Sequence, residues 1–162
     1  MANRIYVKLG DLEGPIHDTD HEKWMEVLSV STGVANNMNT VEKVQGNPGG
    51  EAHHHQDIHI TKVIDSLSPQ LAVHTALGSG FEKAEIEVCE EQELLYKIVL
   101  EKVAIGSYQV GATQDGVPTE SISLNYALIQ YKYRDGAEDH FNLASDASSL
   151  EKKSFGKSFE IG

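Results

Sequence analysis

The sequence is poor in cysteine and contains no long hydrophobic run. Its single cysteine, Cys89, cannot form a disulfide within the chain, so stability does not depend on an oxidising compartment. No stretch approaches the roughly 18 consecutive apolar residues of a transmembrane helix. The first residues, 1–14, lack the apolar segment of a classical signal peptide. We therefore expect a protein that starts in the cytoplasm and has no membrane partner.

Positive charge is also scarce. The 162 residues include 13 Lys and Arg against 25 Asp and Glu, which gives a formal net charge of −12. Such a chain repels phosphate backbones and anionic membranes, and its few aromatic residues are not interleaved with basic ones. We therefore expect no nucleic-acid partner.

Motifs for catalysis are missing as well. The sequence contains no G-x-S-x-G nucleophile elbow and no glycine-rich phosphate loop before a helix. The acids Glu90, Glu91 and Glu93 are typical of a solvated surface run, and Cys89 alternates with apolar residues as a strand residue does. We predict no enzymatic activity, no cofactor, and no catalytic, cofactor-binding or metal-ligating residue.

What the sequence does contain is a succession of β patterns. Residues 4–9 alternate between apolar and polar side chains, and further segments rich in β-forming residues recur along the chain. The predicted strands cover 4–9, 24–32, 56–63, 83–90, 93–110, 119–134 and 138–143. One short helix is predicted after residue 67, with Ser68 as the cap, Pro69 in the first turn and Gly78 or Gly80 at the end.

Irregularities within these strands are also predicted. Gly106 is a candidate bend in the 93–110 segment. The apolar parity switches at Leu128, which indicates either a β-bulge or a strand that leaves one sheet for another. Asp135-Gly136 is a strong tight-turn signal, so 138–143 is expected to return as a hairpin partner.

The patterns sum to roughly eight strands and one helix, without βαβ alternation. We predict a single domain over 1–162. Its expected fold is mostly β: an antiparallel β-barrel of two packed sheets with one short α-helix on the side. A sandwich is the alternative.

Residues 33–55 are the longest irregular segment. Their Gly, Asn and Pro content excludes a regular element over most of the segment, while Met38, Val41 and Val44 would be costly to leave in water. A surface insertion and a loop that orders on a partner both remain open. Several predicted strands are apolar on both faces, which favours a protein that buries surface against other subunits.

Histidines gather where this segment meets the next strand, at His53, His54, His55 and His59. On a strand, His55, Asp57 and His59 would project from one face, and these are ligand types for zinc. A small β-barrel that binds a ligand or metal through this cluster is therefore an alternative function. A hydrolase whose site is assembled from distant residues is a third.

Three segments resemble the Hcp (hemolysin-coregulated protein) family of type VI secretion. They are IYVKLGDLEG with His21 to Ser29 (H-x-x-W-M-E-V-L-S), His55 to Leu71 (H-x-D-I-H-I-T-K-V-I-D-x-x-S-P-x-L), and Pro118 to Tyr126 (P-T-E-S-I-S-L-N-Y). They follow the order and spacing of the family over about residues 4 to 133. The last segment is the most characteristic.

The resemblance implies a tube subunit that is not an enzyme. Six copies would close into a ring, and rings would stack into a phage tail-tube-like tube that meets sheath and spike components. The lumen would carry secreted effector proteins, and the tube would leave the cell through the type VI apparatus without a signal peptide.

The resemblance also suggests which residues take part. The long loop after the second strand would contribute to ring stacking, with the candidates Val34, Asn36, Asn37, Met38, Thr40, Val41, Glu42, Lys43 and Val44. If Glu85, Glu87 and Glu91 face the lumen, they would favour basic cargo.

Overall fold

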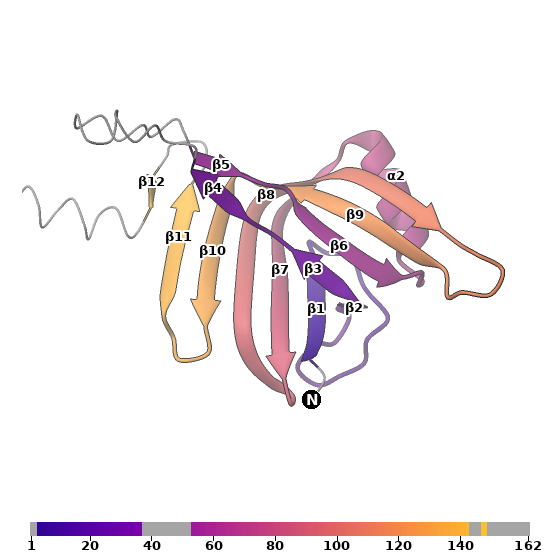
Figure 1. Cartoon of the computed structure of the whole chain (residues 1–162), viewed down its shortest axis with the longest axis horizontal. Coiled ribbons are helices and arrows are strands. Elements are labelled where there is room, and N and C mark those ends of the chain that lie inside the picture. The colour runs from indigo at the N-terminus through magenta and orange to yellow at the C-terminus, as the bar shows by residue number, and fades with distance from the viewer. Residues whose placement is uncertain (1–2, 37–52, 143–146, 149–162) are drawn as a thin grey trace, which may run out of the picture.

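A computed structural model describes residues 3–36, 53–142 and 147–148 of the chain (Figure 1). Strands dominate this part, and a single α-helix, α2 (Ser68–Leu77), accompanies them. The strands are β1 (Asn3–Leu9), β2 (Met25–Val27), β3 (Ser29–Ser31), β4 (Val34–Asn36), β5 (His53–His55), β6 (Ile58–Val63), β7 (Gly80–Glu90), β8 (Glu93–Gly111), β9 (Thr119–Asn125), β10 (Leu128–Tyr133), β11 (Glu138–Asn142) and β12 (Ala147–Ser148).

All strand pairs are antiparallel, and most belong to one large sheet. Its main path runs β12-β11-β10-β8-β7-β1-β2, while β9 joins β8 to β6 and β6 pairs with β3. β2 and β3 are separated only by Leu28, whose backbone amide donates to Thr61 O of β6 at 2.8 Å. The path from β2 through β1, β7, β8, β9 and β6 therefore returns to β3, next to its starting strand. The predicted mostly β, antiparallel fold with one helix is confirmed.

The long strand β8 holds the two halves of the sheet together. Its first part pairs with β10, its last part pairs with β9, and β7 runs beside it on the other edge. Figure 1 shows the β10–β11 hairpin on one side of the molecule and β6, β9 and α2 on the other. The register with β9 shifts between Ile105 and Ser107, so Gly106 is the predicted irregularity.

The core fills the space that this curved sheet encloses. Side chains of alternate residues point inward from strands distant in sequence, and α2 adds Leu71 from one side. Ile58, Ile60, Ile86, Leu100 and Leu124 are almost fully buried. The strand signals in the sequence were therefore reliable because burial alternates with the pleat.

Two sequence predictions, those for residues 24–32 and 119–134, need correction. Residues 24–32 form two short strands instead of one. Residues 33–55 were predicted to lack a regular element over most of the segment, and its two described ends form short strands, β4 and β5, that pair as a separate two-stranded sheet with Val34 opposite His55. The 119–134 run was predicted to contain a β-bulge or to leave one sheet for another. Instead it divides into β9 and β10 at residues 126–127, and both strands stay in the same large sheet, where the neighbour changes from β6 to β11.

The helix begins and ends close to the predicted residues, but its cap is different. Leu67 holds the N-cap position and no side chain caps the helix, while Gly78 ends it in the left-handed conformation at φ 68°. Ser68 was predicted to cap. Instead its hydroxyl accepts from the Asp65 amide at 2.9 Å and donates to Glu120 at 2.9 Å.

Candidate assembly surfaces

An apolar groove lies where the end of β2 meets the end of β6. It has a volume of about 310 Å³, and its lining includes Pro15, Ile16, Leu28, Val63 and Ile64. Leu28 is 58% exposed, and Val63 and Ile64 are 40% and 39% exposed. Large aliphatic side chains gathered from separate segments lose free energy in water, so this groove is a candidate contact surface.

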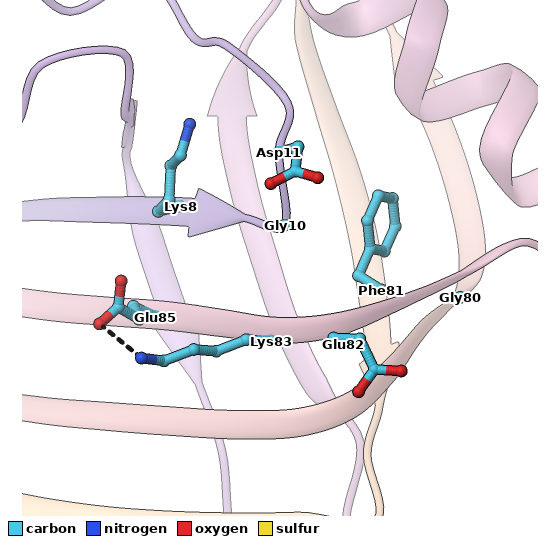
Figure 2. A pocket seen from close by; sticks show the side chains of 8 residues that line it. All are labelled: Lys8, Gly10, Asp11, Gly80, Phe81, Glu82, Lys83 and Glu85. Carbon is cyan, nitrogen blue, oxygen red and sulfur yellow. Dashed lines mark ion pairs between the residues drawn. The ribbon is translucent and has the colours of Figure 1, made fainter.

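A second, charged cavity of about 400 Å³ lies beside the start of β7 (Figure 2). Figure 2 shows Lys8, Asp11 and Phe81 around it, with the Lys83–Glu85 ion pair at one side. Lys8 Nζ donates to the carbonyl of Leu12 at 2.6 Å. No Ser, Cys or His occurs among the eight residues that line it, so it offers no hydroxyl or thiol nucleophile and no imidazole base.

The three acids predicted to face a lumen do not form one uniform patch. Glu85 and Glu87 share a face of β7, and Lys97 binds both, at 3.1 and 3.0 Å. Lys97 is half-buried, and its hydrogen bonds to the two carboxylates raise its pKa against the opposing effect of burial. Glu91 lies apart, exposed in the turn between β7 and β8. Much of the negative charge on β7 is therefore neutralised locally.

A different face of the sheet carries small uncharged polar side chains, which sequence reasoning did not single out. Two rows cross four strands, one through Ser29, Thr61, Ser121 and Gln109, the other through Ser31, His59, Ser123 and Ser107. The hydroxyls of Ser107 and Ser123 lie 2.8 Å apart. Between the two rows, Ile60 and Ile122 point to the core. The alternation was visible in the sequence, but the register that aligns the rows was not.

The predicted stacking residues fall mostly outside the described part of the chain. Val34 begins β4 and is 55% exposed, and Asn36 ends that strand. Asn37, Met38, Thr40, Val41, Glu42, Lys43 and Val44 lie outside the described residues. Their role stays a prediction.

Of the histidine cluster, His59 is exposed on β6, and the structure describes only the backbone of His53–His55 in β5. Asp57 lies between these strands and does not continue a strand with His55 and His59. With its amide nitrogen facing Asp57, Asn125 donates to both carboxylate oxygens, at 2.6 and 2.9 Å. Asp57 is thus engaged by β9, and the alternative binding function stays untested.

The most characteristic sequence segment, 118–126, contributes Glu120 to a buried ion pair that sequence reasoning also missed. Lys62 and Glu120 are direct partners across β6 and β9, are 0% and 1% exposed, and contact each other through Nζ and Oε2. Lys62 also binds Asp65 at 3.0 Å. Ser68 and Tyr108 donate hydroxyl hydrogen bonds to Glu120 at 2.9 and 2.6 Å.

This network fastens the start of α2 to the sheet. Burial and the hydrogen bond to Glu120 raise the pKa of Tyr108 to about 12. Because each charge has several partners, the pair satisfies its polar groups inside the core. The parity of β6 could have revealed it, since Lys62 follows Ile58 and Ile60 on the inward face.

Within the described residues, no helix has the length and apolar character that a membrane crossing requires. This finding agrees with the sequence, in which no long hydrophobic run occurs.

Comparison with known proteins shows which family the chain resembles. The model of the family described as type VI secretion system effector, Hcp, matches residues 6–133. The hcp1 protein of Pseudomonas aeruginosa is 29% identical over 149 residues, which is 86% of this chain and 90% of that protein.

Solved structures give the same result for the fold. A structure described as a type six secretion system protein superimposes with a TM-score of 0.81 at 24% identity, covering 91% of this chain and 100% of the other. Hcp1 from Salmonella typhimurium superimposes with a TM-score of 0.77 at 18% identity, covering 91% and 99% of the two chains. At these identities the likeness concerns the fold.

Proposed function

The chain belongs to the Hcp family of type VI secretion effectors, and from this premise we propose that it is a structural subunit of the secretion tube. Copies form hexameric rings that stack, meet sheath and spike components, and carry effector proteins in the lumen. The match over residues 6–133 is the observation that carries the proposal. Secretion of the tube through the apparatus makes a signal peptide unnecessary.

Ring closure needs a heterologous contact, in which one patch of each copy meets a different patch of the next. We assign one of these patches to the apolar groove around Leu28, Val63 and Ile64, and its occupant is the neighbouring copy. The groove is largely aliphatic, with Glu26 and Asp65 at its margin, as an apolar interface centre with a polar rim would be. In a ring every copy would cover the groove of the next.

Solution mass tests the ring directly. For untagged protein we expect light scattering to give about six times 17.8 kDa, and negative-stain images to show rings. A monomer over a wide concentration range would contradict the proposal. That result would favour the small binding barrel that uses His53–His59, and the metal content of protein purified without a metal column would then be measured.

A pair of variants tests the groove separately. Leu28→Glu places a charge in the proposed contact and is expected to shift the protein from rings to smaller species. Val110→Glu is the matched control, because Val110 on β8 is 54% exposed, close to the value for Leu28, and lies outside the groove. Rings that survive Leu28→Glu would move the interface elsewhere without contradicting ring formation.

Stacking is proposed to involve the segment after β3. Val34 is the candidate with a described side chain, and its 55% exposure leaves it available for contact. Val34→Glu should leave single rings intact and reduce tube formation at high protein concentration. Loss of the rings themselves would place Val34 in the ring interface instead.

Cargo preference depends on which face lines the lumen. If Glu85 and Glu91 face it, reversing both to Lys should weaken retention of basic effector proteins. Unchanged retention would favour the uncharged face that carries Ser31 and His59. Glu87 is left intact in this test, because it binds both Lys97 and His21.

A further inference from the structure

A largely buried cluster brings together His21, Glu87 and Cys89, and Glu87 is also one of the acids predicted to face the lumen. One ligand atom from each residue lies within 4.8 Å of the others. Glu87 and Cys89 project from the outer face of β7, and residues 10–24, which connect β1 to β2, place His21 over them. His21 is 6% exposed and Cys89 is 3% exposed. Imidazole, carboxylate and thiolate are the three ligand types that zinc selects.

The imidazole of His21 is held in place but only half satisfied. Its ring stacks on Tyr6 with centroids 3.9 Å apart and meets the edge of Trp24 at 5.1 Å. Its Nε2 lies 2.8 Å from Glu87 Oε1. Its Nδ1 is buried without a hydrogen-bond partner, and the nearest acid, Asp18, has Oδ2 3.9 Å away. An unsatisfied buried nitrogen is costly and rare, so it requires an explanation.

We propose that His21, Glu87 and Cys89 bind one zinc-class transition-metal ion. Nε2 of His21, Oε1 of Glu87 and Sγ of Cys89 are the protein ligands, and water completes a tetrahedral site. The imidazole proton moves from Nε2 to Nδ1, where it faces Asp18. Asp18 Oδ2 lies 3.9 Å from Nδ1, and a rotation of this exposed side chain would complete the carboxylate–histidine–metal arrangement that orients ligating histidines. In this arrangement Nδ1, which has no hydrogen-bond partner, carries the imidazole proton while Nε2 binds the metal.

The charges of the site balance when the ion is bound. The thiol proton leaves for solvent, and the carboxylate and thiolate together offset the two positive charges of the ion. Lys97 holds the other carboxylate oxygen of Glu87 at 3.0 Å and leaves Oε1 to the metal. The carboxylates of Glu87, Asp18 and Asp20 lie near Cys89, and their negative charge attracts a divalent cation.

An adjoining cavity of about 150 Å³ provides an approach to the cluster. Its lining includes Tyr6, His21 and Cys89 together with Asp18 and Asp20. Arg4 also lines it, and its guanidinium lies 3.6 Å from Glu26. A metal here would fix residues 10–24 to β7 and stiffen one end of the barrel. This inference does not depend on ring assembly.

Cobalt(II) titration of untagged full-length protein tests the site. A cobalt–thiolate bond gives a charge-transfer absorption in the near ultraviolet, and the chain has a single cysteine, so this band reports Cys89 alone. We expect a saturable band at one equivalent, lost on addition of zinc. Cys89→Ser should abolish it. His59→Gln, which changes an exposed histidine outside the cluster, should leave it unchanged.

Asp18→Asn gives a second readout that does not depend on a core substitution, because the Asp18 side chain is 46% exposed. Removing an outer carboxylate of this kind should weaken cobalt binding by about 10–100-fold. Cobalt that binds without a thiolate band, or no binding at saturating cobalt, would overturn the proposal. The proposal would also be overturned if Asp18→Asn and His21→Gln both kept the cobalt–thiolate band and bound cobalt with unchanged affinity.

Discussion

The buried pair of Lys62 and Glu120 gives the sharpest prediction about what holds this fold together. Lys62→Met leaves the carboxylate of Glu120, which is 1% exposed, without its cation. The hydroxyls of Ser68 and Tyr108 still donate to it, but they carry no charge. Breaking a buried pair from one side costs about 3–5 kcal/mol. At about 2–4 °C per kcal/mol, the melting temperature should fall by roughly 6–20 °C.

The reciprocal change should cost less. In Glu120→Gln, Lys62 keeps its ion pair with Asp65 at 3.0 Å and its hydrogen bond to Val63 O at 3.2 Å. We expect a loss of about 1–3 kcal/mol, the cost of a weakened buried hydrogen-bond set. The double variant, Lys62→Met with Glu120→Gln, removes both charges together. Its loss of unfolding free energy should be about 1–3 kcal/mol smaller than the sum of the two single losses.

Urea unfolding followed by circular dichroism measures these differences, with all variants at one protomer concentration because assembly shifts apparent stability. Arg4→Met is the control. Arg4 and Glu26 also form an ion pair, at 3.6 Å, but their side chains are 61% and 41% exposed, so its loss should leave the free energy of unfolding nearly unchanged. If Lys62→Met costs no more than this control, or if the two losses add, the reasoning is wrong.

Two further predictions concern single residues. Because burial and Glu120 raise the pKa of Tyr108 to about 12 while the unfolded chain ionises near 10, its contribution to stability is complete below about pH 10 and disappears toward pH 12. Tyr108→Phe should flatten this alkaline decline in unfolding free energy. Gly10 has φ +55°, and an added Cβ would lie 2.6 Å from Phe81 Cδ1, so Gly10→Ala should cost about 1–3 kcal/mol in urea unfolding. Gly111→Ala, with nothing within 4 Å, should be close to neutral.

Much of the fold could be predicted because the sheet has one buried face. Alternation marked the ends of β1, β6 and β7 to the residue and their starts to within about three residues. Gly106 and Asp135-Gly136 marked a bulge and a turn through local backbone requirements. These signals depend only on neighbouring residues. The pairing of β4 with β5 could not be found this way, since its partners are separated by a long polar segment.

The candidate surfaces were harder to predict for a physical reason. Alternation tells which side chains share a face, but not what covers that face. Tyr6 and Cys89 lie on the outer side of β1 and β7, as the pattern indicates, yet they are 4% and 3% exposed. Residues 10–24 fold over this outer face and bury them. Likewise, alternation did not reveal that Glu85 and Glu87, predicted to face a lumen, pair with Lys97 of the neighbouring strand β8.

The two most elaborate polar clusters of the molecule differ in how completely they are satisfied, and this difference separates structure from function. Around Lys62 and Glu120 both charged groups have short contacts to several partners. A structural role, holding the start of α2 against the sheet, therefore accounts for the whole cluster. Around His21 one buried nitrogen has no partner, although the ring is fixed on both sides. Since folding rarely leaves such a group without compensation, the incomplete cluster is the one that calls for a ligand.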